Sequence, residues 1–190
     1  MSEPKDTKKQ ILDIAENYLL DRGYNGFSYK DISNALGIRN ASIHYHFPKK
    51  TDLGVSIIRR AKGQFERWVQ VLENRAPGYT SELAEFCLLF KKYVKNRQQI
   101  CLGGALETDF KTLPEEMQKE ARELTSAMLR WLERLLEEGR NQAAFNFPGQ
   151  ANAQALAVIS CLQGAIQIVR VTAPSSFDSV VEQITLSVCR

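Results

Sequence analysis

The chain has 190 residues, of which 44% are hydrophobic and 25% are charged, an ordinary balance for a globular protein that excludes disorder and collagen-like repeats. Only 11 glycines and 6 prolines interrupt it, too few for the turns of a β-sandwich or barrel, so we expect an all-α fold. The net charge is +3, and residues 1–70 carry 12 Lys and Arg against 8 Asp and Glu, which gives the first third a mild preference for polyanions.

The sequence shows neither a targeting signal nor a metal motif. Its start is charged and lacks the apolar run of a secretory signal, so we expect a cytosolic protein. The stretch Ala155–Val169 falls short of the roughly 18 apolar residues of a membrane span, so we expect no membrane contact. The four cysteines are too scattered for a zinc site and are expected to be small buried side chains. His44 and His46 point to different sides of a helix, so we expect no metal and no cofactor.

The apolar pattern predicts a first helix over Lys8–Arg22, and two short helices follow it. Ser28 lies three residues before Asp31, a near match to a capping box, and Gly37 ends this second helix. The third helix spans Asn40–His46, before Pro48. Two short helices joined by a glycine-containing turn and braced by a longer one are typical of a helix-turn-helix, although other small bundles share the pattern.

Six further helices are expected along the rest of the chain. The first of them keeps its apolar residues at helical spacing for roughly 35 Å, long enough to leave one small domain and enter another. The expected ranges are Lys50 to about Asn74, near Thr80–Asn96, around Leu102–Phe110, Pro114–Gly139, Ala151–Thr172 and Ser176–Arg190.

The first third carries a closely spaced set of matching positions: Gly26-Phe27-Ser28, Asp31-Ile32, Ala35-Leu36-Gly37-Ile38, His44-Tyr45-His46-Phe47-Pro48, Lys50 and Leu53, together with the apolar residues of the first helix. This stretch resembles the DNA-binding domain of the tetracycline-repressor-like (TetR) family of bacterial transcription regulators. The resemblance implies a helix-turn-helix DNA-binding domain over residues 1–50 and a helical effector-binding and dimerisation domain over residues 51–190.

The resemblance also implies which side chains meet DNA. Those at the start of the third helix are expected at base edges, where Arg suits guanine and Asn suits adenine. Others are expected at phosphates, which set the register. The base-edge residues are Arg39, Asn40, Ala41 and Ser42, and the backbone-contacting residues are Ser28, Tyr29, His44, Tyr45 and Lys50.

Two positions depart from the family pattern. Arg39 stands where the family has a small hydroxyl residue, which leaves Asn40 as the alternative cap of the third helix. His44 stands where the family has a tyrosine, a change that alters a phosphate contact or adds pH sensitivity.

The helix over Ala151–Thr172 is apolar on two sides, so it is either interior or shared with a partner. The resemblance implies that the last two helices form a homodimer interface, with monomeric core helices as the alternative. The candidate interface residues are Leu156, Ile159, Gly164, Ile166, Val180, Ile184 and Val188.

The resemblance further implies a pocket for a small-molecule effector, although aromatic and Met side chains at helical spacing are more often core. Its candidate lining is Phe86, Phe90, Cys101, Phe110, Met128 and Trp131. Cys101 follows Lys95 and Arg97, and basic neighbours favour a reactive thiol, with packing as the alternative.

These features together favour a homodimeric repressor that a small-molecule effector, a thiol-reactive one included, releases from a palindromic operator. The alternatives are a helical protein-interaction module without specific DNA binding and a small helical enzyme. The sequence lacks a glycine-rich phosphate loop and paired carboxylates beside a nucleophile, so we expect no enzymatic activity.

Overall fold

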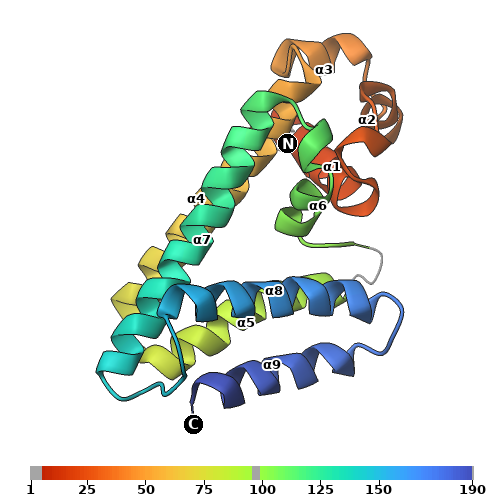
Figure 1. The fold of residues 1–190 in the computed structure, drawn as a ribbon. Helices are drawn as coiled ribbons and strands as arrows, with labels where there is room; N and C mark the ends of the chain where they lie inside the picture. Colours follow the sequence, from red (N-terminus) through yellow and green to blue (C-terminus); the bar gives the residue numbers. More distant parts are fainter. Residues whose placement is uncertain (1–5, 96–98, 190) are drawn as a thin grey trace, which may run out of the picture. The chain divides into compact units, whose positions relative to one another are not determined.

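The computed structural model describes residues 6–95 and 99–189, and it confirms the all-α expectation. Each helix lies within a few residues of its expected range, while the expected helix ends Asn96 and Arg190 lie outside the described residues. The elements are α1 (Thr7–Arg22), η1 (Tyr24–Gly26), α2 (Tyr29–Leu36), α3 (Asn40–His46), α4 (Lys50–Arg75), α5 (Tyr79–Lys95), α6 (Leu102–Thr108), η2 (Phe110–Thr112), α7 (Glu115–Asn141), α8 (Ala151–Val169) and α9 (Ser175–Val188) (Figure 1).

The chain divides into two compact units that are each built from separate stretches of sequence. Unit 1 takes the chain to Gly63 together with Leu102–Leu124, and unit 2 takes Gln64–Cys101 and the chain from Thr125 onward. Two of the divisions therefore fall within α4 and α7, and the third falls directly before α6 (Leu102–Thr108). The domain boundary expected after residue 50 lies inside unit 1, because this unit includes the first part of α4, which Arg60 ties to α1.

Unit 1 is organised around the buried face of α1. Ile11, Ala15 and Leu19 are fully buried, as their spacing predicted. On α4, the Arg60 guanidinium donates to the carboxylates of Asp13, at 2.6 Å, and Glu16, so two side chains of α1 are tied to one side chain of α4.

The later stretch of unit 1 is attached by polar contacts of long sequence separation. The backbone N–H of Tyr24 donates to the Asp109 carboxylate at 2.8 Å, and the Asn25 amide donates to the Thr112 hydroxyl at 2.8 Å. Arg59 on α4 donates through Nε and Nη2 to one oxygen of Glu120 on α7, at 2.8 and 2.6 Å. Such contacts fix η2 and the start of α7 within unit 1.

Unit 2 has its own core, in which α8 packs against α5 and α9 (Figure 1). By length and composition α8 is long and apolar enough to cross a membrane. The shorter stretch Ala155–Val169 was expected to fall below this limit, and the full helix from Ala151 reaches it. Buried core helices pass the same test, and one face of α8 lies in this core. The largest fully buried members of the core include Phe86, Leu132, Leu162 and Phe177.

The expectation of buried cysteines holds for two of the four. Cys87 and Cys101 are buried, and burial raises the pKa of the Cys87 thiol to about 12, so this thiol stays protonated. Cys161 and Cys189 are exposed, so the expectation is wrong for them. Cys161 occupies the outer side of α8, where the surrounding side chains are small or apolar.

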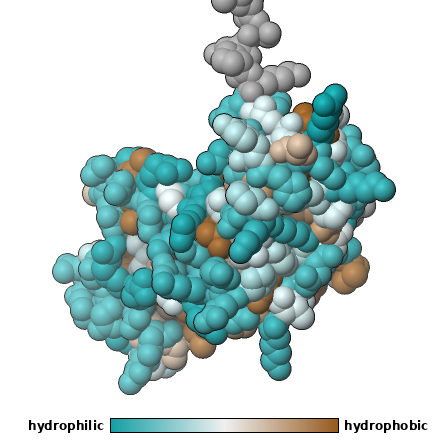
Figure 2. All heavy atoms as spheres, turned by 90° about the horizontal axis from the view of Figure 1, so that it is seen from above, coloured by the Kyte–Doolittle hydropathy of each residue, from teal (hydrophilic) through white to brown (hydrophobic). Residues whose placement is uncertain are grey.

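The face of the molecule drawn in Figure 2 is mostly hydrophilic, with apolar side chains in small separate patches. Exposed large apolar side chains do occur on α8 and in the turn after it. There Leu156, Ile168 and Val171 are 56%, 53% and 85% exposed.

Candidate nucleic-acid interface

A carboxylate fixes the first turn of α2. Asp31 Oδ2 accepts hydrogen bonds from the Ser28 hydroxyl at 2.6 Å and from the Ser28 backbone N–H at 2.7 Å. These bonds lower the pKa of the Asp31 carboxyl below its usual value. The helix ends at Gly37, whose φ of 65° lies in the left-handed region that favours glycine. Both ends of α2 thus follow the signals in the sequence.

The inner face of α3 is held by burial and by one hydrogen bond. Ile43 is fully buried and Phe47 is 2% exposed. The Tyr29 hydroxyl donates to the backbone carbonyl of Phe47 at 2.8 Å, which ties the start of α2 to the end of α3. The ammonium of Lys8 on α1 lies 5.8 Å from the centre of the Phe47 ring. Contacts from α1 and α2 therefore fix the orientation of α3.

The outer face of α3 begins with an exposed arginine and an exposed asparagine. Arg39 is the residue before the helix, and Asn40 is the first helical residue, so Asn40 is not the cap that the sequence suggested. Arg39, Asn40 and Ala41 are exposed, and Ser42 is half-buried. A guanidinium and a carboxamide at the start of an exposed helix are the groups that pair bidentately with guanine and adenine.

The last turn of α3 presents His44 and Tyr45. Tyr45 is 83% exposed, and His44 is exposed too. The ring of Tyr29 packs edge-on against the imidazole of His44, with 4.8 Å between ring centres. Because the Tyr29 hydroxyl donates its proton to Phe47, Tyr29 positions α3 and has no proton left for a phosphate. Burial raises the pKa of Tyr29, so the phenol stays neutral.

The expected phosphate contact of Lys50 does not fit the structure. Its ammonium donates to the backbone carbonyls of Tyr24 and Phe27, both at 2.5 Å, and lies 4.4 and 4.3 Å from the centres of their rings. Burial lowers the pKa of Lys50. This side chain binds the turn between α1 and α2 from inside. The Ser28 hydroxyl likewise donates its hydrogen bond to Asp31, so it can accept a hydrogen bond from a ligand but cannot donate one to a phosphate.

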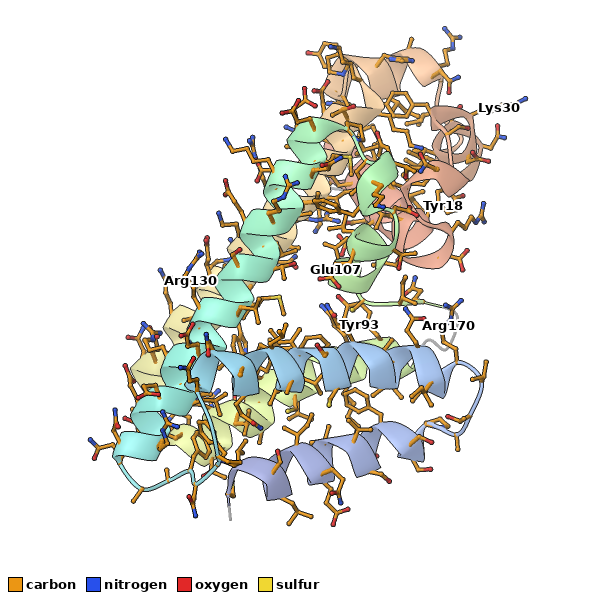
Figure 3. All side chains as sticks on the ribbon, viewed as in Figure 1. Tyr18, Lys30, Tyr93, Glu107, Arg130 and Arg170 are labelled. Carbon is orange, nitrogen blue, oxygen red and sulfur yellow. The ribbon has the colours of Figure 1, made fainter. Side chains whose placement is uncertain are left out.

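Other cations in this part of unit 1 are exposed. Lys30 points away from α2 into solvent (Figure 3). Lys49 is exposed too, and its backbone N–H donates to the Asp52 carboxylate at 2.8 Å at the start of α4. Sequence reasoning did not single out these two lysines, although the positive balance of residues 1–70 signalled such a surface.

Five of the six expected effector-contacting residues lie in the core of unit 2. Phe86, Phe90, Cys101 and Trp131 are buried there, and Met128 packs against the same cluster. Phe110 is separate from them: it lies in η2 of unit 1, with the Arg122 guanidinium 4.7 Å from its ring centre. The residue Arg97 and the side chain of Lys95, which suggested a reactive Cys101, lie outside the described part of the chain.

The expected interface residues fall into two groups. Ile159, Ile166, Ile184 and Val188 are at most 4% exposed, so they belong to the core of a single copy. These four side chains have no surface to offer a partner in this conformation. The other three retain surface: Leu156 is exposed, and Gly164 and Val180 are half-buried.

The geometry agrees with what the comparisons with known proteins found. The sequence model described as "Bacterial regulatory proteins, tetR family" matches residues 11–56. A TetR-family transcriptional regulator from Agrobacterium tumefaciens superposes with a TM-score of 0.91 and 27% identity over 99% of this chain and 100% of that one. A TetR transcriptional regulator from Legionella pneumophila superposes with a TM-score of 0.87 and 28% identity, over 98% of this chain and 100% of that one.

A similar relative in sequence is the HTH-type transcriptional repressor NemR of Escherichia coli strain K12, which is 21% identical over 84% of this chain and 82% of that protein. The crystal structure of the reduced form of E. coli NemR superposes with a TM-score of 0.79 and 18% identity, over 96% of this chain and 97% of that one, and so shares the fold.

Replacing Lys50 by Met removes the donor of two carbonyl groups but keeps an apolar stem over the two rings. We expect a loss of about 1–3 kcal/mol in the free energy of unfolding in urea, because each acceptor loses its bond. The adjacent Lys49→Met, at an exposed site, should change stability by about 0.5 kcal/mol or less.

Lys50→Met should also leave the salt dependence of DNA binding unchanged. Loss of a phosphate contact would instead lower the slope of log affinity against log salt by about 0.9 for each copy bound.

Proposed function

The chain belongs to the TetR family of bacterial regulatory proteins, and we propose that it represses transcription as a homodimer bound to a palindromic operator. It is a DNA-binding transcriptional regulator rather than an enzyme. The observation that carries the proposal is α3, a helix anchored by Ile43 and Phe47 whose opposite side exposes Arg39, Asn40 and Ala41. Its exposed groups match the chemistry of base edges in the major groove.

Reading an operator requires two copies of α3. A two-fold dimer presents two recognition helices to half-sites about 34–36 Å apart, or a multiple of that distance, on one side of the duplex. The palindrome in the operator then mirrors the symmetry of the protein. Side chains late in α3, Tyr45 among them, suit the flanking phosphates.

The outer side of α8 is the best surface for a second copy. Leu156, Ile168 and Val171 are exposed on one side of α8 and the turn after it. The same side of α8 carries the small residues Ala153, Ala157, Ser160, Cys161 and Gly164. Large apolar side chains gathered on one face mark protein interfaces. A side chain built at Gly164 would meet nothing within 4 Å in one copy, so this glycine leaves room for a close neighbour.

The effector is proposed to act on the aromatic cluster of unit 2. Trp131 has Trp68 and Phe86 at ring-centre distances of 5.1 and 5.2 Å, and Phe90 lies 5.5 Å from Phe86. Aromatic side chains of this kind line sites for small apolar ligands. A coupling of about 1–3 kcal/mol between effector and operator, or roughly 5- to 150-fold in affinity, is typical of such regulators.

Arg39→Ala and Asn40→Ala should each weaken operator binding by roughly 5- to 150-fold for each half-site, because a bidentate base contact contributes about 1–3 kcal/mol of discrimination and the dimer loses two. A gel-shift titration against duplexes from the region flanking the coding sequence measures the effect. Arg130→Ala, which removes an exposed arginine from α7 in unit 2, is the matched control and should bind as the wild type does. Equal affinity for operator and random duplex would contradict the proposal.

Gly164→Arg should weaken dimerisation by tenfold or more, about 1.4 kcal/mol, because it introduces a charged side chain into the contact. The single copy has space for the new side chain, so helicity by circular dichroism should be unchanged. Analytical ultracentrifugation over a range of protein concentrations measures the equilibrium, with Gln70→Arg on the exposed side of α4 as the control. A wild-type dimerisation constant in the α8 variant would exclude this face.

If the effector is thiol-reactive, its proposed target is the thiol of Cys101, which is buried in the unit 2 core. N-ethylmaleimide should then release the operator from the wild type and from Cys161→Ser, but not from Cys101→Ser. The exposed Cys189, which lies outside the proposed dimer face, should be labelled first and the buried Cys101 slowly, as mass spectrometry over time would show. Release that persists in Cys101→Ser would rule out this thiol.

A further inference from the structure

The imidazole of His44 is held in one orientation by two neighbours. Its Nδ1 lies 3.2 Å from the backbone carbonyl oxygen of Pro48, and its ring packs edge-on against Tyr29. Tyr29 is itself fixed by its bond to the Phe47 carbonyl. The ring is nevertheless exposed, so its remaining nitrogen, Nε2, is the one that a ligand can reach.

The bond to Pro48 decides which nitrogen carries the proton. A carbonyl oxygen can only accept, so Nδ1 must be the donor in this contact. In a neutral imidazole the other nitrogen is then unprotonated and presents a lone pair. A neutral His44 therefore offers an acceptor at Nε2, and an acceptor makes no hydrogen bond to a phosphate oxygen.

Protonation changes only this exposed nitrogen. In the imidazolium both ring nitrogens donate, so Nδ1 keeps its bond to Pro48 while Nε2–H becomes a charged donor. The tyrosine that the family carries at this position has a neutral hydroxyl, which donates at any physiological pH. At this position the present chain replaces a constant donor by a titratable one.

The elements next to His44 in the fold carry the following charged and titratable groups. Lys8 of α1 lies over the Phe47 ring, Tyr29 of α2 touches the imidazole, and the start of α4 brings Lys49 and Asp52. On α3 itself the neighbours are Tyr45 and His46, whose rings contact each other at 5.1 Å. Burial raises the pKa of Tyr29, which leaves it a neutral phenol beside the imidazole. Neither described contact of His44 is with a carboxylate.

We propose that His44 is a proton-linked phosphate contact, so that binding of duplex DNA takes up a proton at this side chain. The inference rests on the proposed function, because it requires α3 to lie against a DNA backbone. Imidazole is the side chain that ordinarily changes charge between about pH 5 and pH 8, and a phosphate beside Nε2 favours the charged form. Affinity then rises as the pH falls, by at most tenfold per pH unit for each proton taken up, and a dimer carries two copies of His44.

The test measures affinity and salt dependence together. Fluorescence anisotropy is recorded at about pH 6 and about pH 8, within the range in which histidine titrates. The probes are a duplex enriched by this protein from a randomised DNA library and a random-sequence duplex of the same length. The wild type should bind both about tenfold more tightly at the lower pH. Its slope of log affinity against log salt should also be steeper there by about 0.9 for each added phosphate contact, or about 1.8 for the two copies of His44 in a dimer.

The two histidines of the chain provide matched variants. His44→Gln should lose both the pH dependence and the change in salt slope, and His46→Gln should keep both. His44→Lys, charged at both pH values, should keep the steeper slope throughout. A wild type that prefers the enriched duplex with the same affinity and slope at both pH values overturns the inference alone, as does pH dependence that survives in His44→Gln. A wild type without preference for the enriched duplex at either pH overturns the proposed function.

Discussion

The orientation of α3 depends on the burial of two side chains, Ile43 and Phe47. The helix has seven residues, whereas an isolated helix in water needs about 12–15 to be even marginally stable. Burying an aliphatic or aromatic side chain contributes about 1.5–3 kcal/mol, so these two side chains supply what the short backbone cannot. Because the inner face holds the helix, the exposed side chains of Arg39, Asn40 and Ala41 are left for a ligand.

Most of the fold could be predicted from the sequence because its signals are local. The spacing of Ile11, Ala15 and Leu19 indicates the buried side of α1, and all three are fully buried. The Ser28–Asp31 pair begins α2, Gly37 ends it in a left-handed conformation, and α3 spans the expected Asn40–His46. The two signals at the ends of α2 work through backbone groups within one turn, and the apolar spacing of α1 repeats every turn, so nearby residues suffice to identify them.

The errors concern contacts between residues far apart in sequence. Lys50 stands at a helix start, at a position where the resemblance implies a phosphate contact, yet its ammonium donates to the carbonyls of Tyr24 and Phe27. Phe110 was grouped with the effector cluster because it is aromatic, but it packs with Arg122 in unit 1. The pairing of Arg59 with the buried Glu120 joins residues 61 positions apart, and no periodicity reveals such a pair. A charge pattern alone does not identify the partner of a charge.

The packing of unit 2 constrains how an effector acts there. Trp131 contacts Phe65, Trp68 and Phe86 at ring-centre distances of 6.1, 5.1 and 5.2 Å, so three aromatic rings already pack against its indole. A ligand that contacts these rings must separate some of them, and close-packed interiors respond by repacking rather than by stretching. Binding energy then shifts the balance between two arrangements of the cluster, and only a difference in affinity for the two does so. If the effector acts on this cluster, as proposed, changes of ring volume there should alter sensing and stability together.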